Sequence, residues 1–380
     1  MPLSNSPLKN KLQQNLAERA AQGTLRSLKT TAGLIDFCSN DYLGLARSEK
    51  LRALIRKEEE RYRHLPLGAT GSRLLSGNHG LFEELEGIVA SFHKGEAALL
   101  FNSGYTANVG LLSALPQRGD TVFYDEASHA SMKDGLRLSF AKTYSFRHNS
   151  VEDLRQKMKR ATGQVYVVVE SVYSMDGGKA PLQELAQVCN EQGAALIVDE
   201  AHAVGLYGDK GEGLTVALGL EKQVFAQVIT YGKAMGAHGA TVVGPQVLRD
   251  FLINYSRAFI YTTGLPTHAL VALKCAYTLL PELAPQRERV QQLATRLYQK
   301  LNKLSGIRCT PEDSVILSVF PQEPRQLKTL AAALQQAGFD VRPVLPPTVP
   351  AGTERLRVIV HAYNSEEEID GLVQAIAKGT

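Results

Sequence analysis

The sequence is poor in the features that mark several common protein classes. Its four cysteines (Cys38, Cys189, Cys275 and Cys309) lie far apart and form no CxxC pair, which argues against a metal site or a disulfide framework. No apolar stretch approaches the length of a membrane-spanning helix. Residues 1–21 lack the apolar core of a signal peptide. We therefore expect a cytoplasmic protein in a reducing compartment, without a membrane partner.

A concentrated charge of one sign is also missing. The 380 residues carry a formal net charge of +4, and the basic excess is spread along the chain. Because a nucleic-acid surface requires a clustered basic patch, we expect no nucleic-acid partner. The fingerprint GxGxxG follows no strand-like run, which excludes a plain Rossmann dehydrogenase. The run 199–202 (DEAH) has no accompanying GxxxxGK[ST] loop, which excludes a helicase-type ATPase.

The region from about residue 50 to residue 275 alternates short apolar runs with helix-like segments. This pattern predicts an α/β protein whose large domain has a mainly parallel sheet, buried on both faces. The apolar runs are 97–101, 121–124, 164–169, 194–198, 227–230 and 240–243.

The pattern changes after about residue 275 and predicts a smaller α/β domain. We expect a charged helix over 281–305, an apolar strand over 315–320, a helix near 324–337, a proline-rich loop over 343–350 and a strand over 356–360. Ser365 and Glu368 have the spacing of a capping box at the start of a last helix. An amphipathic helix over 8–22 begins the N-terminal segment. The predicted division is 1–48 (helix and arm joining the small domain), 49–275 (large domain) and 276–380 (small domain).

Lys233 lies in a glycine-rich turn directly after the apolar run 225–229. Glycines on both sides would give a reactive amine room to move. Asp199 ends another apolar strand, and His202 follows three residues later. A lysine that forms a Schiff base and an acid for a pyridinium nitrogen are what pyridoxal phosphate requires of a protein. We therefore predict pyridoxal 5'-phosphate as the cofactor.

Polar residues follow three further apolar runs. Gly104 and Tyr105 stand where run 97–101 gives way to a helix, whose first N–H groups are suited to a phosphate. Thr230 offers that phosphate a hydroxyl, His129 is placed to stack on the ring and share proton transfer, and Ser174 follows run 164–169. Each feature alone has an ordinary structural explanation, such as a helix cap or a loop contact. Their repetition at several strand ends favours a single site.

Taken together, these residues resemble the α-oxoamine synthases, a branch of the fold-type I, aspartate aminotransferase-like pyridoxal-phosphate transferases. The similarity extends from 39–44 (SNDYLG) to Arg357. It is most specific at 71–77 (GSRLLSG) and at 346–352 (PPTVPAG). Within the branch, these stretches are most similar to the synthases of biotin biosynthesis.

The resemblance implies a role for each site residue. Lys233 forms the Schiff base, Asp199 pairs with the pyridine nitrogen, His202 and Ser174 bind the phenolic oxygen, and His129 stacks on the ring. Gly104, Tyr105 and Thr230 lie near the phosphate, and Thr262 or Thr263 reaches it from a second subunit. The residues implied to contact the substrates are Arg26, Asn40, Thr348 and Arg357.

The implied reaction is a decarboxylative Claisen condensation of an amino acid with an acyl thioester, in a homodimer with shared active sites. L-Alanine with pimeloyl-CoA or a pimeloyl carrier protein fits the resemblance best. Glycine with acetyl-CoA and serine with a long acyl thioester remain alternatives, since Leu345 stands where some synthases have arginine. A protein that binds the cofactor without catalysis is a further alternative, against which the joint presence of Lys233, Asp199, His129 and Arg357 argues.

Overall fold

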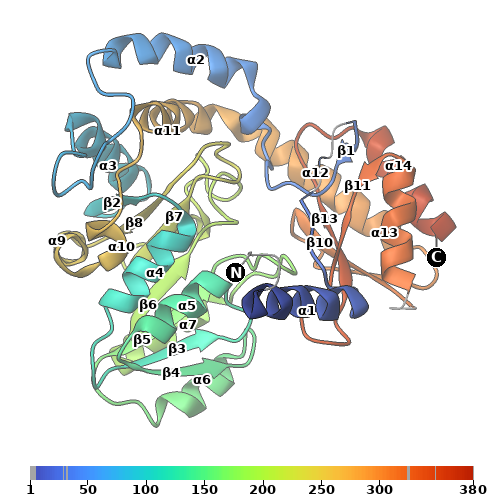
Figure 1. The fold of residues 1–380 in the computed structure, drawn as a ribbon, viewed down its shortest axis with the longest axis horizontal. Coiled ribbons are helices and arrows are strands. Elements are labelled where there is room, and N and C mark those ends of the chain that lie inside the picture. The colour runs from blue at the N-terminus through green and yellow to red at the C-terminus, as the bar shows by residue number, and fades with distance from the viewer. Residues whose placement is uncertain (1–5, 29, 31–32, 323–325, 347, 380) are drawn as a thin grey trace.

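The computed structural model describes residues 6–28, 30, 33–322, 326–346 and 348–379 (Figure 1). Pro347 of the stretch 346–352 lies outside the described residues, as do residues 324 and 325 of the helix expected near 324–337. Within the described part of the chain, no helix combines the length and apolar character needed to span a membrane.

A seven-stranded sheet forms the centre of the larger part of the molecule, in the order β2-β8-β7-β6-β5-β3-β4. All adjacent pairs from β7 to β4 are parallel, and only β8 runs antiparallel to its neighbours β2 and β7. The mainly parallel sheet is thus confirmed. Its strands are β2 (Ala97–Phe101), β3 (Thr121–Asp125), β4 (Lys142–Phe146), β5 (Val165–Glu170), β6 (Ala195–Asp199), β7 (Val224–Thr230) and β8 (Ala240–Gly244).

The edge strand β4 was not predicted from the sequence. Its residues, KTYSF, alternate between exposed and partly buried positions, and only Phe146 is buried. An edge strand covered on one side needs no continuous apolar run, so its sequence lacks the signal that marks the central strands.

Helices pack on both faces of this sheet (Figure 1). Alternate side chains of a strand enter different hydrophobic clusters: Val167 and Val169 belong to one, and Tyr166 and Val168 to the other. The helices of this part are α2 (Glu49–Glu59), α3 (Gly80–Phe92), α4 (Gly104–Ala114), α5 (Ala130–Leu138), α6 (Val151–Met158), α7 (Leu182–Gln192), α8 (Leu214–Ala217), α9 (Gln246–Tyr255), α10 (Arg257–Ile260) and α11 (Thr267–Leu279). Short 3-10 turns cover Leu45–Arg47, Glu60–Tyr62 and Leu280–Leu283.

A smaller antiparallel sheet, in the order β12-β13-β10-β9, lies beside the first part. Its strands are β9 (Ile307–Thr310), β10 (Ile316–Pro321), β12 (Arg342–Val344) and β13 (Arg355–Ile359), and its helices are α12 (Ala284–Leu301), α13 (Leu327–Gln336) and α14 (Glu366–Gly379). The capping box is confirmed, because Ser365 N donates to Glu368 Oε2 at 3.0 Å and Glu368 N to Ser365 Oγ at 3.1 Å.

Two expectations for this region need correction, and one strand was missed. The charged helix expected over 281–305 opens with a 3-10 turn and is α-helical only over Ala284–Leu301. Strand β9 was not anticipated. Pro343, expected in a loop, lies in β12, which is an edge strand, the part of a sheet where proline is tolerated.

The N-terminal segment contributes a strand to the smaller part. β1 (Ile35–Asp36) pairs in parallel with β11 (Phe339–Asp340). Helix α1 (Pro7–Ala21) has no buried residue, and its row of Leu8, Leu12 and Leu16 is exposed. The helix is thus present, but the leucines of its expected apolar side stay exposed among the described residues. The division at residues 48 and 275 stays a prediction.

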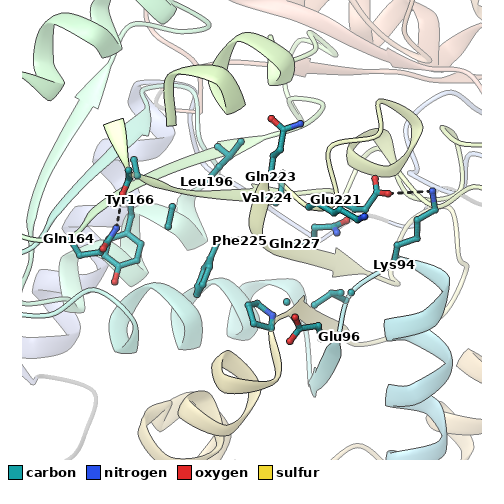
Figure 2. A pocket seen from close by; sticks show the side chains of 18 residues that line it. Lys94, Glu96, Gln164, Tyr166, Leu196, Glu221, Gln223, Val224, Phe225 and Gln227 are labelled. Carbon is teal, nitrogen blue, oxygen red and sulfur yellow. Dashed lines mark hydrogen bonds and ion pairs between the residues drawn. The ribbon is translucent and has the colours of Figure 1, made fainter. Parts of the chain in front are cut away.

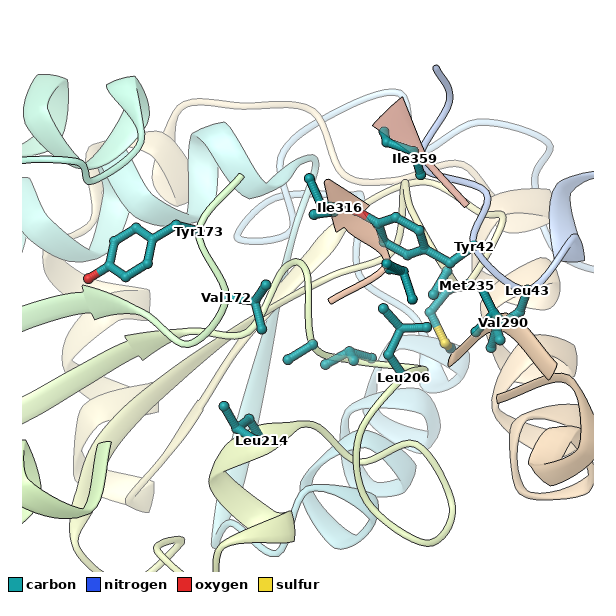
Figure 3. Packing of buried hydrophobic residues seen from close by; sticks show 14 of the residues in the cluster. Tyr42, Leu43, Val172, Tyr173, Leu206, Leu214, Met235, Val290, Ile316 and Ile359 are labelled. Atoms are coloured by element: carbon teal, nitrogen blue, oxygen red, sulfur yellow. The ribbon is translucent and has the colours of Figure 1, made fainter. Parts of the chain in front are cut away.

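One continuous hydrophobic cluster joins the two parts (Figure 3). Tyr42 and Leu43 of the N-terminal arm meet Leu206 and Met235 from loops of the large sheet, with Ile316 and Ile359 of the small sheet nearby. This packing holds β13, and therefore Arg357, next to the carboxyl ends of the large sheet's strands.

Candidate active site

A cavity of about 350 Å³ lies at the carboxyl edge of the large sheet, where β5, β6 and β7 end and α4 and α5 begin. This is the edge at which parallel α/β sheets commonly bind ligands. Most residues predicted from the sequence line it: Asn40, Gly104, Tyr105, His129, Ser174, Asp199, His202, Thr230, Lys233 and Arg357.

Asp199 is buried at the end of β6 and is held by two donors. Asn108 Nδ2 donates to its Oδ2 at 2.8 Å, and Ala201 N donates to its Oδ1 at 2.9 Å. These contacts fix the carboxylate in one orientation facing the cavity. A buried carboxylate of this kind is suited to a cationic N–H group.

Lys233 enters the cavity from the turn after β7. Its Nζ donates to Thr230 Oγ1 at 3.4 Å, a long contact that leaves the amine available. Desolvation by the surrounding protein lowers the pKa of Lys233, opposed by the charges of Asp199 and Glu170. A lowered pKa increases the fraction of uncharged, nucleophilic amine.

Two glycines near Lys233, Gly232 and Gly236, have different surroundings. A Cβ on Gly232 would meet its nearest atom only at 3.9 Å, so this glycine is not required by space. Gly236 has a φ of +61°, and a Cβ there would lie 2.3 Å from Ala46 N. The expected role of Gly232, room beside the lysine amine, stays a prediction. Gly236 is needed because the 3-10 turn at residues 45–47 packs directly against it.

The start of α4 provides a cradle of backbone N–H groups. Ser103 caps the helix, accepting from Thr106 N at 3.2 Å. A Cβ on Gly104 would lie 2.6 Å from Thr230 Cγ2, so glycine lets the first turn of α4 approach the end of β7. Tyr105 lines the cavity but is about half exposed, and its hydroxyl binds Asp134. An anion at this helix start would face N–H groups and the positive end of the helix dipole.

His129 and His202 reach the cavity from different strand ends. His202 is buried, and its Nδ1 lies 2.6 Å from Tyr42 Oη, which also donates to Asn40 Oδ1 at 3.1 Å. Burial holds the pKa of His202 well below its usual range. His129 is the N-cap residue of α5, is exposed, and lines the cavity.

Arg357 connects the two parts of the molecule across the cavity. Its Nε donates to Ser174 O at 2.7 Å and its Nη2 to Asn40 Oδ1 at 3.1 Å. A guanidinium has five N–H donors, so these two contacts leave others for a carboxylate.

Sequence reasoning missed several residues of the site, among them Glu170, Asn108 and Ser131. Glu170, at the end of β5, accepts from His129 N at 2.7 Å and from Ser174 N at 3.3 Å. Burial, together with the charge of Asp199, raises its pKa to about 8. Asn108 Nδ2 donates to Ser131 Oγ, which in turn contacts His129 Nδ1. Only Glu170 gave a usable signal, because it ends an apolar strand as Asp199 does.

Four predicted residues do not line this cavity. Asn102 Nδ2 donates to Thr263 O at 2.9 Å and to Thr262 Oγ1 at 3.5 Å. Both threonines therefore lie next to the residue that precedes the N-cap of α4. Their expected contact with a cofactor of a second subunit stays a prediction. Arg26 Nη2 donates to Thr348 Oγ1 at 3.4 Å, so these two distant residues do meet, on an exposed surface outside the cavity.

A second, larger cavity of about 930 Å³ lies at the opposite, amino edge of the same sheet (Figure 2). It is bordered by Lys94, Glu221 and the beginnings of β5, β6 and β7. None of the residues predicted for the site lines it. Its size alone therefore does not mark a reactive site.

The smaller cavity fits pyridoxal phosphate. It has a fixed buried carboxylate for a pyridinium N–H, a loosely held lysine amine, and a helix start whose N–H groups suit a phosphate. The other polar side chains of the cavity include His129, His202, Ser174 and Arg357 as possible hydrogen-bond partners, and Glu170, whose raised pKa reduces its negative charge.

Comparison with known proteins decides the family. The family model for aminotransferase class I and II matches residues 32–376. The chain belongs to this family. It is an α/β enzyme of fold type I that depends on pyridoxal phosphate, and its reaction class is acyl transfer.

Individual relatives cover nearly the whole chain. The 8-amino-7-oxononanoate synthase of Emericella nidulans is 39% identical, over 99% of this chain and 97% of that protein. The serine palmitoyltransferase of Sphingomonas wittichii superposes with a TM-score of 0.90 at 29% identity, covering 98% of both chains. The 8-amino-7-oxononanoate synthase of Francisella tularensis gives 0.78 at 28% identity, over 91% of this chain and 97% of that one.

Proposed function

We propose that this enzyme condenses L-alanine with a pimeloyl thioester to form 8-amino-7-oxononanoate, carbon dioxide and the free thiol of coenzyme A or a carrier protein. The observation that carries the proposal is the joining of Lys233 and Asp199 with Arg357 and Asn40 in one cavity of about 350 Å³. The first pair suits carbanion chemistry, and the second suits an amino-acid carboxylate. The full-length similarity to the Emericella nidulans synthase supports the choice of substrates.

When bound, pyridoxal phosphate supplies an electron sink for negative charge at the α-carbon of the amino acid. Asp199 holds the proton at the pyridine nitrogen, because its fixed carboxylate stabilises the N–H cation. Lys233 Nζ takes the α-proton and later returns it. Its lowered pKa increases the fraction of uncharged amine that can accept the proton.

Two pairs of residues recognise the two carboxylates of the substrates. Arg357 and Asn40 bind the carboxylate of alanine and orient its α-proton towards Nζ. Arg26 and Thr348, 3.4 Å apart, present a cation and a hydroxyl to the distal carboxylate of the pimeloyl chain. We also infer that the enzyme is a cytoplasmic homodimer in which Thr262 or Thr263 of one copy contacts the cofactor phosphate of the other.

A second candidate is the condensation of serine with a long acyl thioester. It is favoured by the TM-score of 0.90 to the Sphingomonas wittichii serine palmitoyltransferase. Leu345 agrees with it, because an apolar residue packed on the core suits an uncharged chain. Arg26 disagrees with it, since a long hydrocarbon chain offers no partner to a guanidinium. Glycine with acetyl-CoA is the third possibility within the same reaction class.

The test is a panel of L-alanine, glycine and L-serine, each with pimeloyl-, acetyl- and palmitoyl-CoA, measured by release of free thiol and by mass spectrometry of the product. We expect alanine with pimeloyl-CoA to give the highest kcat/KM. A higher value for serine with palmitoyl-CoA, or for glycine with acetyl-CoA, would replace the proposed substrates. Repeating the best pair with an acyl carrier protein then identifies the natural thiol.

A further inference from the structure

His129 is held by the start of the helix that follows it. Its ring nitrogen Nδ1 accepts a hydrogen bond from Ser131 N at 3.2 Å and so caps α5. A backbone N–H can only donate. Nδ1 therefore presents its lone pair to the helix, which favours the neutral ring that carries its proton on Nε2.

A second donor reaches the same nitrogen through a directed chain of hydrogen bonds. Asn108 Nδ2 donates to Asp199 Oδ2 at 2.8 Å and to Ser131 Oγ at 3.1 Å, which uses both of its N–H groups. Since Ser131 Oγ accepts from Asn108, its own hydrogen is free to point at His129 Nδ1, 2.8 Å away. Asn108 and Ser131 are both buried, so water does not compete for these contacts.

The surroundings also disfavour a charged His129. The start of α5 carries the positive end of a helix dipole, which repels an imidazolium. Desolvation lowers the pKa of His129, with Lys233 and Lys133 acting in the same direction and Asp199 and Asp134 opposing them. A neutral imidazole held in one tautomer by a helix N-terminus is an established way of making histidine a hydrogen-bond donor in catalysis.

We propose that Asn108 and Ser131 are positioning residues that lock His129 as the neutral Nε2–H tautomer, so that it donates from Nε2 to a substrate oxygen in the cavity and does not act as a base. These hydrogen bonds also link His129 to Asp199, because the Asn108 amide donates to both Asp199 and Ser131. Only the part in which Nε2 donates to a substrate oxygen rests on the proposed function. The tautomer itself follows from the protein's own contacts.

Nitrogen NMR of the enzyme labelled with ¹⁵N-histidine tests the tautomer directly. The His129 signals are identified by their loss in His129→Asn. We expect a protonated Nε2 and a bare Nδ1 throughout the neutral pH range, both with pyridoxal phosphate bound and after its removal. A protonated Nδ1 at neutral pH, whether in the neutral Nδ1–H tautomer or in the imidazolium, would overturn the proposal.

Ser131→Ala tests the series of hydrogen bonds from Asn108 through Ser131 to His129. It keeps the backbone donor but removes the hydroxyl, so a second tautomer should become populated and the titration of His129 should move to higher pH. We expect kcat to fall about tenfold, as for the loss of one aligned hydrogen bond, with little change in the KM for the amino acid. Asn108→Leu, of similar volume, should change the His129 signals in the same direction.

Ser128→Ala is the matched control, because Ser128 carries a buried hydroxyl with no hydrogen-bond partner among the described residues. It should change neither the His129 signals nor kcat. Unchanged His129 signals in Ser131→Ala, in protein that melts like wild type and retains its cofactor, would refute the role of Ser131. Failure of the substrate panel would leave the NMR result intact, so the two proposals fail separately.

Discussion

The two edges of the seven-stranded sheet carry cavities of opposite character. The amino edge has the larger one, about 930 Å³, bordered by the ion pair of Lys94 and Glu221 at 3.6 Å (Figure 2). The carboxyl edge has only about 350 Å³, yet it gathers Asp199, Glu170 and His202 in buried positions. Chemistry follows buried polar groups and not volume.

The direction of the parallel strands explains this difference. Every parallel strand points its carboxyl end to the same edge, and α4 and α5 begin there, so helix N-termini converge with strand-end side chains. Burial at this edge shifts the pKa of several groups, upwards for Glu170 and downwards for Lys233. At the amino edge, Lys94 remains about half exposed and its charge is solvated.

The largest expected effect is that of Lys233→Ala. Removing the amine eliminates both the covalent link to the cofactor and the proton acceptor, so turnover should fall by on the order of 10⁴-fold or more. Steady-state assay and the visible absorbance spectrum measure this. A variant that kept the spectrum of a lysine-linked cofactor would place the link at another lysine.

Asp199→Asn should reduce kcat by about 10²- to 10³-fold, because an amide cannot stabilise the protonated ring nitrogen where charge develops. Cofactor content should change little. Exchange of the α-proton of alanine with deuterated solvent isolates the step concerned. Exchange at the wild-type rate would contradict the role given to this carboxylate.

Arg357→Lys should raise the KM for alanine about ten- to a hundredfold and leave the KM for the thioester nearly unchanged. A lysine cannot reproduce the planar pair of hydrogen bonds to a carboxylate. Equal losses for both substrates, or a lower melting temperature, would instead indicate that the contacts to Ser174 and Asn40 are structural.

Arg26→Ala should lower kcat/KM for pimeloyl-CoA about tenfold, the loss expected for one charge-assisted hydrogen bond. An uncharged acyl-CoA of equal length is the control substrate and should be unaffected. If both thioesters suffer equally, Arg26 does not bind the distal carboxylate.

The smallest effect is expected at the amino edge. Lys94→Ala breaks a half-exposed ion pair worth about 0–1 kcal/mol, so activity should stay within about twofold of wild type. Lys94 lines only the cavity at the amino edge, so this variant tests whether that cavity serves function. A tenfold loss of activity in a stably folded variant would show that the larger cavity also serves function.

Much of this protein could be predicted from local sequence pattern. The central strands were predictable because they are buried on both faces and read as continuous apolar runs. The predicted residues that end them, Asp199 and Thr230, and those that follow them, such as His129 and Lys233, meet at one edge because parallel strands share a direction. Those residues indicated a pyridoxal-phosphate enzyme before any contact was known.

Contacts between distant segments were decided only by the tertiary structure. Asn108 binds Asp199 across 91 residues, and Arg357 binds Ser174 across 183, and neither spacing leaves a mark in the sequence. The same holds for Arg26 and Thr348, which meet outside the cavity. Local pattern determines which residues end each strand, because it reflects burial along one element. Packing determines which side chains share a hydrogen bond, because that depends on how separate elements come together.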